Sequence, residues 1–298
     1  MTFSKIPPTI CRLLAMAVEG SPAANWRFGG RAVGDTLNAW CRRFQRSTVT
    51  DPILVDGQQV YHGDHPSSLD MALGLWEPKT MRLMRHLLRP GMTFVDVGAH
   101  IGWHTLLAAR AVGTTGHVYA FEPDPSNFNL LRKNVAVNEF ESRVTLVPAA
   151  ICDTNRRVSL FTLGRGSVCS TMFGMPGVGV ECLEVEATSL DQFFGRRNWP
   201  PIDFIKMDIE GAEGVALRGM RELSLRNPDL KLIIEYVPPN LQAAGNTPRW
   251  LFEILDELGF CRRSIISWRL MPVGSPDDII RRTKRNWYGN LLCEKMRH

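Results

Sequence analysis

Two glycines follow an apolar stretch in FVDVGAHIGWHT, residues 94–105. They are Gly98 and Gly102, and Asp96 stands two residues before the first of them. The apolar stretch predicts a buried strand, and a glycine turn at its end lets a small polar ligand approach the backbone and the positive end of the next helix. The spacing Gly-x-x-x-Gly differs from the Gly-x-Gly-x-x-Gly of dinucleotide sites, which counts against NAD and FAD.

An acidic residue, Glu122, ends the next predicted strand, twenty residues after Gly102. At such a position a carboxylate can accept hydrogen bonds from both hydroxyls of an adenosine ribose. The glycine turn and this acid together favour adenosine without a pyrophosphate, and S-adenosylmethionine is the obvious candidate. Its amino-acid end would lie on the turn, where Asp96 can meet the ammonium directly or through water. A structural turn and a helix cap are the alternative interpretations.

Acidic side chains concentrate in KMDIEGAE, residues 206–213. Methyl transfer from a sulfonium is an in-line displacement that depends mainly on positioning, with a base needed only for the acceptor's proton. We expect Asp208 or Glu210 to be this base or to orient the acceptor, because both fall where a strand meets the predicted site. Glu213 is explained by the preference of a helix's first turn for acids. Glu235, near the end of the following strand, is a second-rank candidate.

Histidines and a metal are further candidates at this site. His104 borders the glycine turn, and because histidine as a residue type is a ready base near neutral pH, it is a candidate base, with a packing or capping role as the alternative. The carboxylates of Asp208, Glu210 and Glu235 supply the oxygens that Mg²⁺ prefers. The sequence has no diagnostic metal spacing, so a divalent cation is compatible with it but not indicated, and we predict no metal ligand.

Four segments carry a resemblance to a known family: FVDVGAHIGWHTLLAA, VYAFEPDPSNFNLLRKNVAVN, TSLDQF and IDFIKMDIEGAEGVALRGM. Together they resemble the FkbM family of S-adenosylmethionine-dependent methyltransferases, over roughly residues 75–295. The resemblance implies a class I methyltransferase fold, Rossmann-like α/β, with a seven-stranded, mostly parallel sheet whose last strand is antiparallel. It also implies acceptors that are mainly hydroxyl groups of polyketides, glycans and glycolipids.

The resemblance assigns cofactor-binding roles to particular residues. It makes Asp96, Gly98 and Gly102 the turn on the methionine side, and Glu122 the ligand of the ribose. The family usually has Asn where this chain has His100. At this position the backbone contact is expected to remain, although the side chain departs from the family's pattern.

The remaining cofactor contacts follow less directly from the resemblance. It places the adenine near the end of the third strand, around residues 149–153, where we take Ala150 as the contact. Asp208 is counted among the residues that border the cofactor as well as among the catalytic candidates.

These residues need a scaffold in which strands and helices alternate. Strand-like segments lie at 93–97, 117–122, 143–149, 202–208 and 231–237, and helical segments at 78–88, 102–112, 125–135, 213–223 and 247–259. Such alternation predicts a parallel sheet with helices on both faces. The last strand-like segments, 261–268 and 289–296, have no helix between them, which predicts an antiparallel last strand. Within the interval 154–200, segments 157–163 and 183–190 look like paired strands around a glycine-rich stretch that could close over an acceptor.

We expect two regions. Residues 1–74 form an N-terminal extension with one or two helices and a small β-hairpin at 52–63, where Asp56-Gly57 has the usual chemistry of a hairpin turn. Residues 75–298 form the methyltransferase domain.

Composition limits the partners and the compartment. The chain has 298 residues, 22% of them charged, and a net charge of +5, an excess too diffuse to argue for nucleic acid. Its seven cysteines contain no Cys-x-x-Cys pair, so neither a disulfide framework nor a zinc site is indicated. No apolar run approaches the ~20 residues of a spanning helix. We expect a cytoplasmic protein; peripheral membrane contact and the oligomeric state stay open.

The leading hypothesis is an S-adenosylmethionine-dependent O-methyltransferase. Its acceptor would be a hydroxyl of a sugar, glycolipid or polyketide-type natural product. The alternatives are an N-methyltransferase, a catalytically inactive protein that binds S-adenosylmethionine, and a nucleotide-binding oxidoreductase. The glycine spacing argues against the last of these, and the acids at 208 and 210 argue against lost catalysis.

Overall fold

The computed structural model describes residues 52–62, 76–162, 170–173, 180–267, 269–283 and 289–295. It contains two compact units, residues 1–78 and 79–298. In the first unit, β1 (Ile53–Val55) pairs antiparallel with β2 (Gln58–Val60), which confirms the predicted hairpin. Asp56 and Gly57 have φ values of 50° and 77°, the left-handed pair of a type I′ turn. The helices predicted within residues 1–47 lie outside the described residues, and the assignment of domains to 1–74 and 75–298 stays a prediction.

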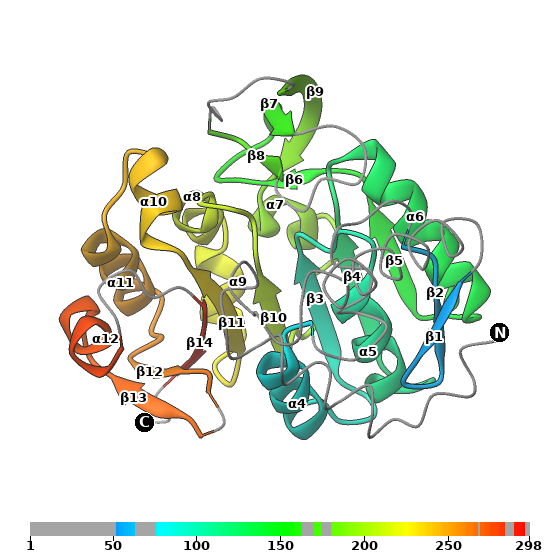
Figure 1. The fold of residues 1–298 in the computed structure, drawn as a ribbon, viewed down its shortest axis with the longest axis horizontal. Coiled ribbons are helices and arrows are strands. Elements are labelled where there is room, and N and C mark those ends of the chain that lie inside the picture. Colours follow the sequence, from blue (N-terminus) through cyan, green and yellow to red (C-terminus); the bar gives the residue numbers. More distant parts are fainter. Residues whose placement is uncertain are drawn as a thin grey trace, which may run out of the picture. The chain divides into compact units, whose positions relative to one another are not determined.

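The second unit is built on an eight-stranded sheet in the order β13-β12-β14-β11-β10-β3-β4-β5 (Figure 1). The strands are β3 (Thr93–Val97), β4 (His117–Phe121), β5 (Val144–Val147), β10 (Phe204–Met207), β11 (Lys231–Tyr236), β12 (Arg262–Ile265), β13 (Met271–Val273) and β14 (Gly289–Glu294). Strands β5, β4, β3, β10 and β11 are parallel, and β14 runs antiparallel to both β11 and β12. The mostly parallel α/β sheet with an antiparallel last strand is therefore confirmed. The expected absence of a helix between the last two strand-like segments was wrong, because α12 (Pro276–Arg282) lies between β12 and β14.

The sheet has one strand more than the seven we expected. The additional strand, β13, pairs antiparallel with β12 at the edge of the sheet. Its central residue is Pro272, which lacks an amide hydrogen and is tolerated only where a strand has no second neighbour to bond. A three-residue segment with a central proline gives too weak a pattern to be recognised as a strand in the sequence.

Helices connect the strands. In order they are α4 (Pro78–Leu87), α5 (Trp103–Val112), α6 (Pro125–Val137), α7 (Leu190–Gly195), α8 (Glu213–Arg218), α9 (Arg221–Arg226), α10 (Pro238–Ala243), α11 (Pro248–Glu257) and α12 (Pro276–Arg282). The start of α6 is fixed by Asp124, whose side chain accepts from the amides of Ser126 and Asn127. Thr247 caps α11 in the same manner, and both helices have proline at the first position, as such starts favour. None of the helices in the described residues is long and apolar enough to cross a membrane.

The segment 213–223, expected to be one helix, forms two, α8 and α9. A Cβ atom at Gly219, in the break between them, would lie 2.3 Å from the carbonyl oxygen of Cys152, so a larger residue would force the chain away. After the break, the carboxylate of Asp191 accepts from the amides of Glu222 and Leu223, at 3.1 and 2.8 Å. These amides belong to the first turn of α9, where no intrahelical acceptor exists, so Asp191 stabilises the new helix start.

The main core fills the space between the sheet and the helices. It includes side chains from eight strands and from helices such as α8, α9 and α11, among them Val97, Phe121, Ile205, Met207, Ala216, Leu217, Leu223, Leu232, Ile234, Leu251, Leu255 and Leu291. Each large aliphatic side chain buried in this way contributes about 1.5–3 kcal/mol relative to exposure. The strand ends that carry polar residues are therefore anchored in a rigid apolar layer.

A second, four-stranded sheet belongs to the same unit, in the order β6-β9-β7-β8 (Figure 1). Its strands are β6 (Ala150–Ile151), β7 (Arg156–Thr162), β8 (Ser170–Thr171) and β9 (Glu181–Thr188). Strands β7 and β9 are antiparallel, which confirms the predicted pairing within this interval. Much of the glycine-rich stretch, at 163–169 and 174–179, lies outside the described residues.

Candidate functional site

The predicted site residues gather where β3, β4, β10 and β11 end. Lys206 of β10 lies in register with Asp96 of β3. One step further, the amide of Asp208 donates to the carbonyl of Val97 at 3.0 Å. Parallel strands thus bring the residues after β3 and those after β10 into direct contact, as expected at the carboxyl edge of such a sheet.

The glycine turn is shaped by this contact. Gly98 has φ 80°, and a Cβ atom there would lie 2.0 Å from the carbonyl oxygen of Asp208. The amides of Gly98 and Ala99 donate to Phe121, at 3.0 and 2.9 Å, and the amide of Gly102 donates to Ala99. Glycine at 98 therefore permits the close approach of two strand ends. The backbone donors that remain for a ligand at this turn are the first-turn amides of α5, which have no intrahelical acceptor.

Asp96 has an unsatisfied oxygen at this turn. The residue is fully buried, and its Oδ2 accepts from the Thr105 hydroxyl at 2.6 Å. Its Oδ1 has no hydrogen-bond partner among the described residues. Burial raises the pKa of Asp96, against the attraction of Lys206 and His104. A buried acceptor without a partner is costly, so a donor such as an ammonium group fits this position.

Glu122 joins the turn to the start of α6. It is 4% exposed, and its two oxygens accept from the amides of Asp124 at 2.9 Å and His100 at 2.7 Å. Burial nevertheless raises the pKa of Glu122 to about 8. Each carboxylate oxygen can accept a second hydrogen bond, so these two contacts leave capacity for the two hydroxyls of a ribose.

The two histidines have different surroundings. His100 has φ 52°, a left-handed conformation in which Asn, Asp and His are enriched over other non-glycine residues. The exchange of the family's usual Asn for His100 therefore keeps a residue type suited to the turn. His104 is 7% exposed in the first turn of α5, and a positive charge on its ring would lower the pKa of Asp96. Its role as a base stays a prediction.

Three carboxylates form what we call the acidic cluster, made of Asp208, Glu210 and Glu235. Each offers an oxygen within 4.8 Å of the others, and all three side chains are partly exposed. Lys206, 1% exposed, places its Nζ 2.7 Å from Oδ2 of Asp208. The pKa of Glu235 lies well above its usual value, because of burial first and then repulsion by Asp208 and Glu210. The arrangement can orient a polar acceptor and accept its proton. Carboxylate oxygens could also hold a hard cation, but Lys206 already neutralises part of the charge.

The loop after β10 is closed by Glu213, which we had explained only as a first-turn acid. Glu213 is 2% exposed and accepts from the amides of Ile209 and Gly211, each at 3.0 Å. Burial raises its pKa to about 8. Its carboxylate therefore shapes the loop that carries Asp208 and Glu210. The pattern Glu-Gly-x-Glu was the signal in the sequence, but its spacing fits a helix start equally well.

Two residues at this site were missed in the sequence. The side-chain amide of Asn240, in α10, donates to Oε2 of Glu210 at 2.7 Å. The hydroxyl of Thr171, in β8, donates to the carbonyl of Glu210 at 3.0 Å. Both belong to elements far from Glu210 in the sequence, and no local pattern marks them.

Ala150 lies apart from these polar groups. It pairs with Ala187 of β9 and is 5% exposed. Its side chain packs in an apolar cluster with Cys152 and Leu160. A contact with adenine at this position stays a prediction.

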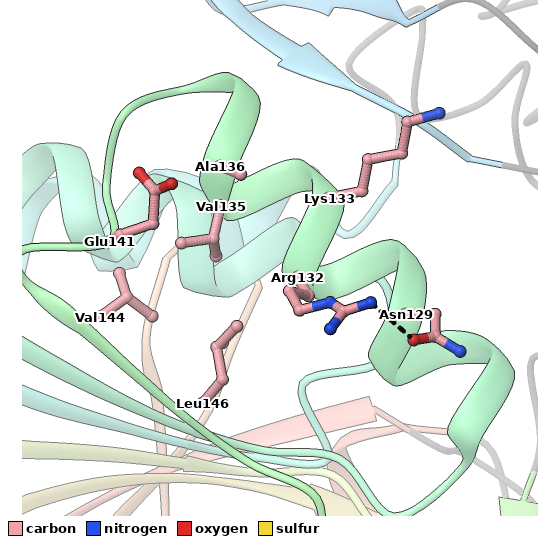
Figure 2. Close-up of a pocket in the computed structure, with 8 residues that line it drawn as sticks. All are labelled: Asn129, Arg132, Lys133, Val135, Ala136, Glu141, Val144 and Leu146. Atoms are coloured by element: carbon pink, nitrogen blue, oxygen red, sulfur yellow. Dashed lines mark hydrogen bonds between the residues drawn. The ribbon is translucent and has the colours of Figure 1, made fainter.

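A pocket of about 730 Å³ lies between α6 and the edge strand β5 (Figure 2). It is lined by Asn129, Arg132, Lys133, Val135, Ala136, Glu141, Val144 and Leu146. None of the predicted site residues contributes to it, and the figure shows apolar side chains from the strand facing a helix with charged ones. The pocket is therefore separate from the predicted site at the carboxyl ends of β3, β4, β10 and β11.

Comparison with known proteins connects the site to a family. The model of the "Methyltransferase FkbM domain" matches residues 96–261, more than half of the chain. The 31-O-demethyl-FK506 methyltransferase FkbM of Streptomyces tacrolimicus is 29% identical over 163 residues, 45% of this chain and 62% of that protein. The arsenite methyltransferase of Halobacterium salinarum is 37% identical over 73 residues, 24% of this chain and 18% of that protein. The chain thus spans less than two thirds of these curated relatives.

Solved structures with similar backbones include two methyltransferases. A SAM-dependent O-methyltransferase from Thermotoga maritima has a TM-score of 0.43 and 16% identity, covering 74% of this chain and 66% of its own. A SAM-dependent methyltransferase from Aquifex aeolicus has a TM-score of 0.42 and 16% identity, covering 78% and 93%.

Proposed function

Because the chain belongs to the FkbM family of methyltransferases, whose methyl donor is S-adenosylmethionine, we propose that it methylates a hydroxyl group of a sugar, glycolipid or polyketide-type natural product. The observation that supports this most directly is the acidic cluster, whose carboxylates lie within 4.8 Å of one another. The cluster adjoins the glycine turn, since Asp208 touches Gly98. A proton acceptor and a candidate cofactor turn are therefore neighbours.

The chain offers a donor site with three parts. The unpartnered Oδ1 of Asp96 suits the ammonium of the methionine moiety, and the first-turn amides of α5 suit its carboxylate. The carboxylate of Glu122 suits the two ribose hydroxyls. When bound, S-adenosylmethionine supplies an activated methyl group. The protein's part is to hold the acceptor in line and to take its proton.

Among the acids, we assign the proton to Glu210. Asp208 is paired with the buried Lys206 at 2.7 Å, and this ion pair fixes its carboxylate, which suits Asp208 to orienting the acceptor. Glu210 receives a hydrogen bond from the side-chain amide of Asn240, which is an uncharged donor. The Glu210 carboxylate would take the proton of the acceptor hydroxyl as the methyl group passes from the donor's sulfur to that oxygen and the demethylated donor leaves.

The choice of oxygen as the acceptor atom follows a curated relative that is covered over 62% of its length. Its name describes methylation of a 31-O-demethyl compound, an acceptor that lacks a methyl group on oxygen. Nitrogen acceptors and binding of the cofactor without turnover are the alternatives. We also propose that residues 75–298 form the catalytic domain and that residues 1–74 are an extension of it.

Calorimetry on the full chain tests the donor site. We expect micromolar binding of S-adenosylmethionine and of S-adenosylhomocysteine. Binding should weaken about tenfold to a hundredfold in Glu122→Ala, because hydrogen bonds to a charged group contribute about 1.5–3 kcal/mol. Glu253→Gln, an exposed change on α11, is the control. Gly98 is a poor position for this test, because any side chain there collides with Asp208. Absence of binding to both compounds contradicts the proposal.

A second assay tests the acceptor atom. The protein and donor labelled in the methyl group are incubated with a panel of methyl glycosides, glycolipids and polyketide alcohols, and with matched amines in place of the hydroxyls. We expect label on oxygen in at least one class, and loss of that product in Glu210→Gln. Label found only on the amines would replace O-methylation by N-methylation, and a full yield from Glu210→Gln would remove Glu210 from its role.

A further inference from the structure

Glu210 stands in a turn of two left-handed residues. Its φ is 54°, and that of Gly211 is 101°. A residue with a Cβ atom is unfavourable in this conformation and persists there only where surrounding contacts hold it. The contacts around the turn therefore decide where the Glu210 side chain points.

The backbone of the turn is held from two sides. Glu213 accepts from the amides of Ile209 and Gly211, and Thr171 donates to the Glu210 carbonyl. These bonds fix the path of the chain through the turn. They do not fix the carboxylate of Glu210, which lies at the end of a side chain with three rotatable bonds.

The carboxylate is held by Asn240. The Nδ2 of Asn240 donates to Oε2 of Glu210 at 2.7 Å, at the short end of the range for hydrogen bonds to charged acceptors. Asn240 is itself fixed against the turn, because a Cβ atom on Gly211 would lie 2.7 Å from the Asn240 carbonyl oxygen. Helix α10, which begins directly after β11, thus holds the side-chain amide of Asn240 at a set distance from the Glu210 carboxylate.

The charges around Glu210 make this donor important. Asp208 and Glu235 bring carboxylate oxygens within 4.8 Å, and Glu213 lies in the same loop. Lys206, a cation among the described residues of this group, is bonded to Asp208. Repulsion by neighbouring carboxylates would turn Glu210 away from them and favour its protonated form. The neutral side-chain amide of Asn240 opposes both the rotation of Glu210 away from its neighbours and its protonation, and it does not neutralise the charge of the carboxylate.

We propose that Asn240 is a positioning residue that holds the Glu210 carboxylate, charged, beside Asp208 and Glu235 for the methyl acceptor. This inference rests on the proposed function, in which Glu210 takes the acceptor's proton. It adds a residue of α10 to the site, and it explains why a glycine is needed at 211, where that helix packs on the turn.

Carboxyl titration by NMR tests the inference without an acceptor. The full chain is labelled with ¹³C at glutamate side-chain carboxyls, and the Glu210 signal is assigned by its loss in Glu210→Gln. In Asn240→Ala we expect the titration midpoint of Glu210 to rise by about one pH unit, because a hydrogen bond to the charged form is lost. Asn246→Ala is the matched control, since among the described contacts the side-chain amide of Asn246 donates only to the nearby Ala244 carbonyl. It should leave the midpoint unchanged.

A second variant guards against misfolding. Asn240→Asp keeps the side-chain shape but faces Glu210 with a like charge, so the midpoint should rise further than in Asn240→Ala. Binding of S-adenosylhomocysteine, measured on the same samples, should stay within twofold of the unchanged protein. If the titration midpoint of Glu210 is the same in the unchanged protein, in Asn240→Ala and in Asn240→Asp, the inference is overturned. Loss of S-adenosylhomocysteine binding in the unchanged protein would instead count against the proposed function, whatever the titration gives.

Discussion

At the scale of single residues, one carboxylate has to serve both the fold and a ligand. Glu122 bonds the amides of His100 and Asp124, and its pKa is raised to about 8 by burial. Around neutral pH the folded, ligand-free protein therefore holds much of this residue protonated. Ribose hydroxyls donate more strongly to the ionised form, since hydrogen bonds to a charged acceptor are roughly twice as strong.

This predicts that cofactor binding depends on pH. The affinity for S-adenosylhomocysteine should increase as the pH rises from 6.5 to 9, through the raised pKa of Glu122. Glu122→Gln cannot ionise, so it should bind more weakly and lose this component of the pH dependence. Calorimetry across the pH range, with the same ligand for both proteins, cancels the titration of the ligand's own amine. Parallel pH profiles for the two proteins would contradict the assignment.

A second prediction concerns the residue that departs from the family's pattern. His100→Asn should change the free energy of unfolding by less than about 0.5 kcal/mol, because Asn also tolerates the left-handed φ of 52°. His100→Val should lower it by about 1–2 kcal/mol, because a β-branched residue is strained there. Urea unfolding distinguishes the two. Equal stability of both variants would show that the conformation of the turn does not select the residue.

At the scale of elements, the break between α8 and α9 depends on a side chain from α7. Asp191 accepts from two first-turn amides of α9, which have no intrahelical acceptor. Asp191→Ala should therefore lower the free energy of unfolding by about 1–2 kcal/mol, as for the loss of a helix cap. Asp191→Asn, which keeps one acceptor oxygen, should cost less. Urea midpoints measure both, and an unchanged midpoint in Asp191→Ala would refute this role.

Elements also show what the sequence can and cannot reveal. The strands at 93–97 and 204–207 were predictable because their apolar runs end in polar residues, and α6 and α11 because Asp-Pro and Thr-Pro mark their starts. The site residues on those strand ends could be placed for the same reason. The contact of Asn240 with Glu210 could not, because it depends on how α10 packs on a turn thirty residues earlier.

At the scale of the whole molecule, buried acids make stability depend on pH. The pKa values of Glu122 and Glu213 are about 8 in the folded protein, against an ordinary value of 4.5. The folded state thus binds protons more tightly than the unfolded chain. The stability that these groups contribute is fully present below pH 4.5 and is lost as the pH rises through about 8.

Urea midpoints of the full chain should therefore fall between pH 6 and pH 9. The control is the double variant Glu122→Gln with Glu213→Gln. In this variant, the part of the pH dependence of the urea midpoint that these two residues cause should disappear. Other acids with a raised pKa, such as Glu235, remain in that control. The comparison of slopes therefore isolates the two substituted residues. Identical slopes would mean that neither residue is protonated in the folded state.

The position of β14 has a consequence for how the protein is made. This strand, residues 289–294, lies between β11 and β12 in the sheet although it is synthesised after both. Until residues 289–294 have emerged from the ribosome, β11 and β12 therefore lack their common neighbour, and both expose unpaired backbone groups. We expect the sheet to be completed only after release of the last strand. A nascent chain stalled before residue 289 would remain open to pairing with other unfolded chains.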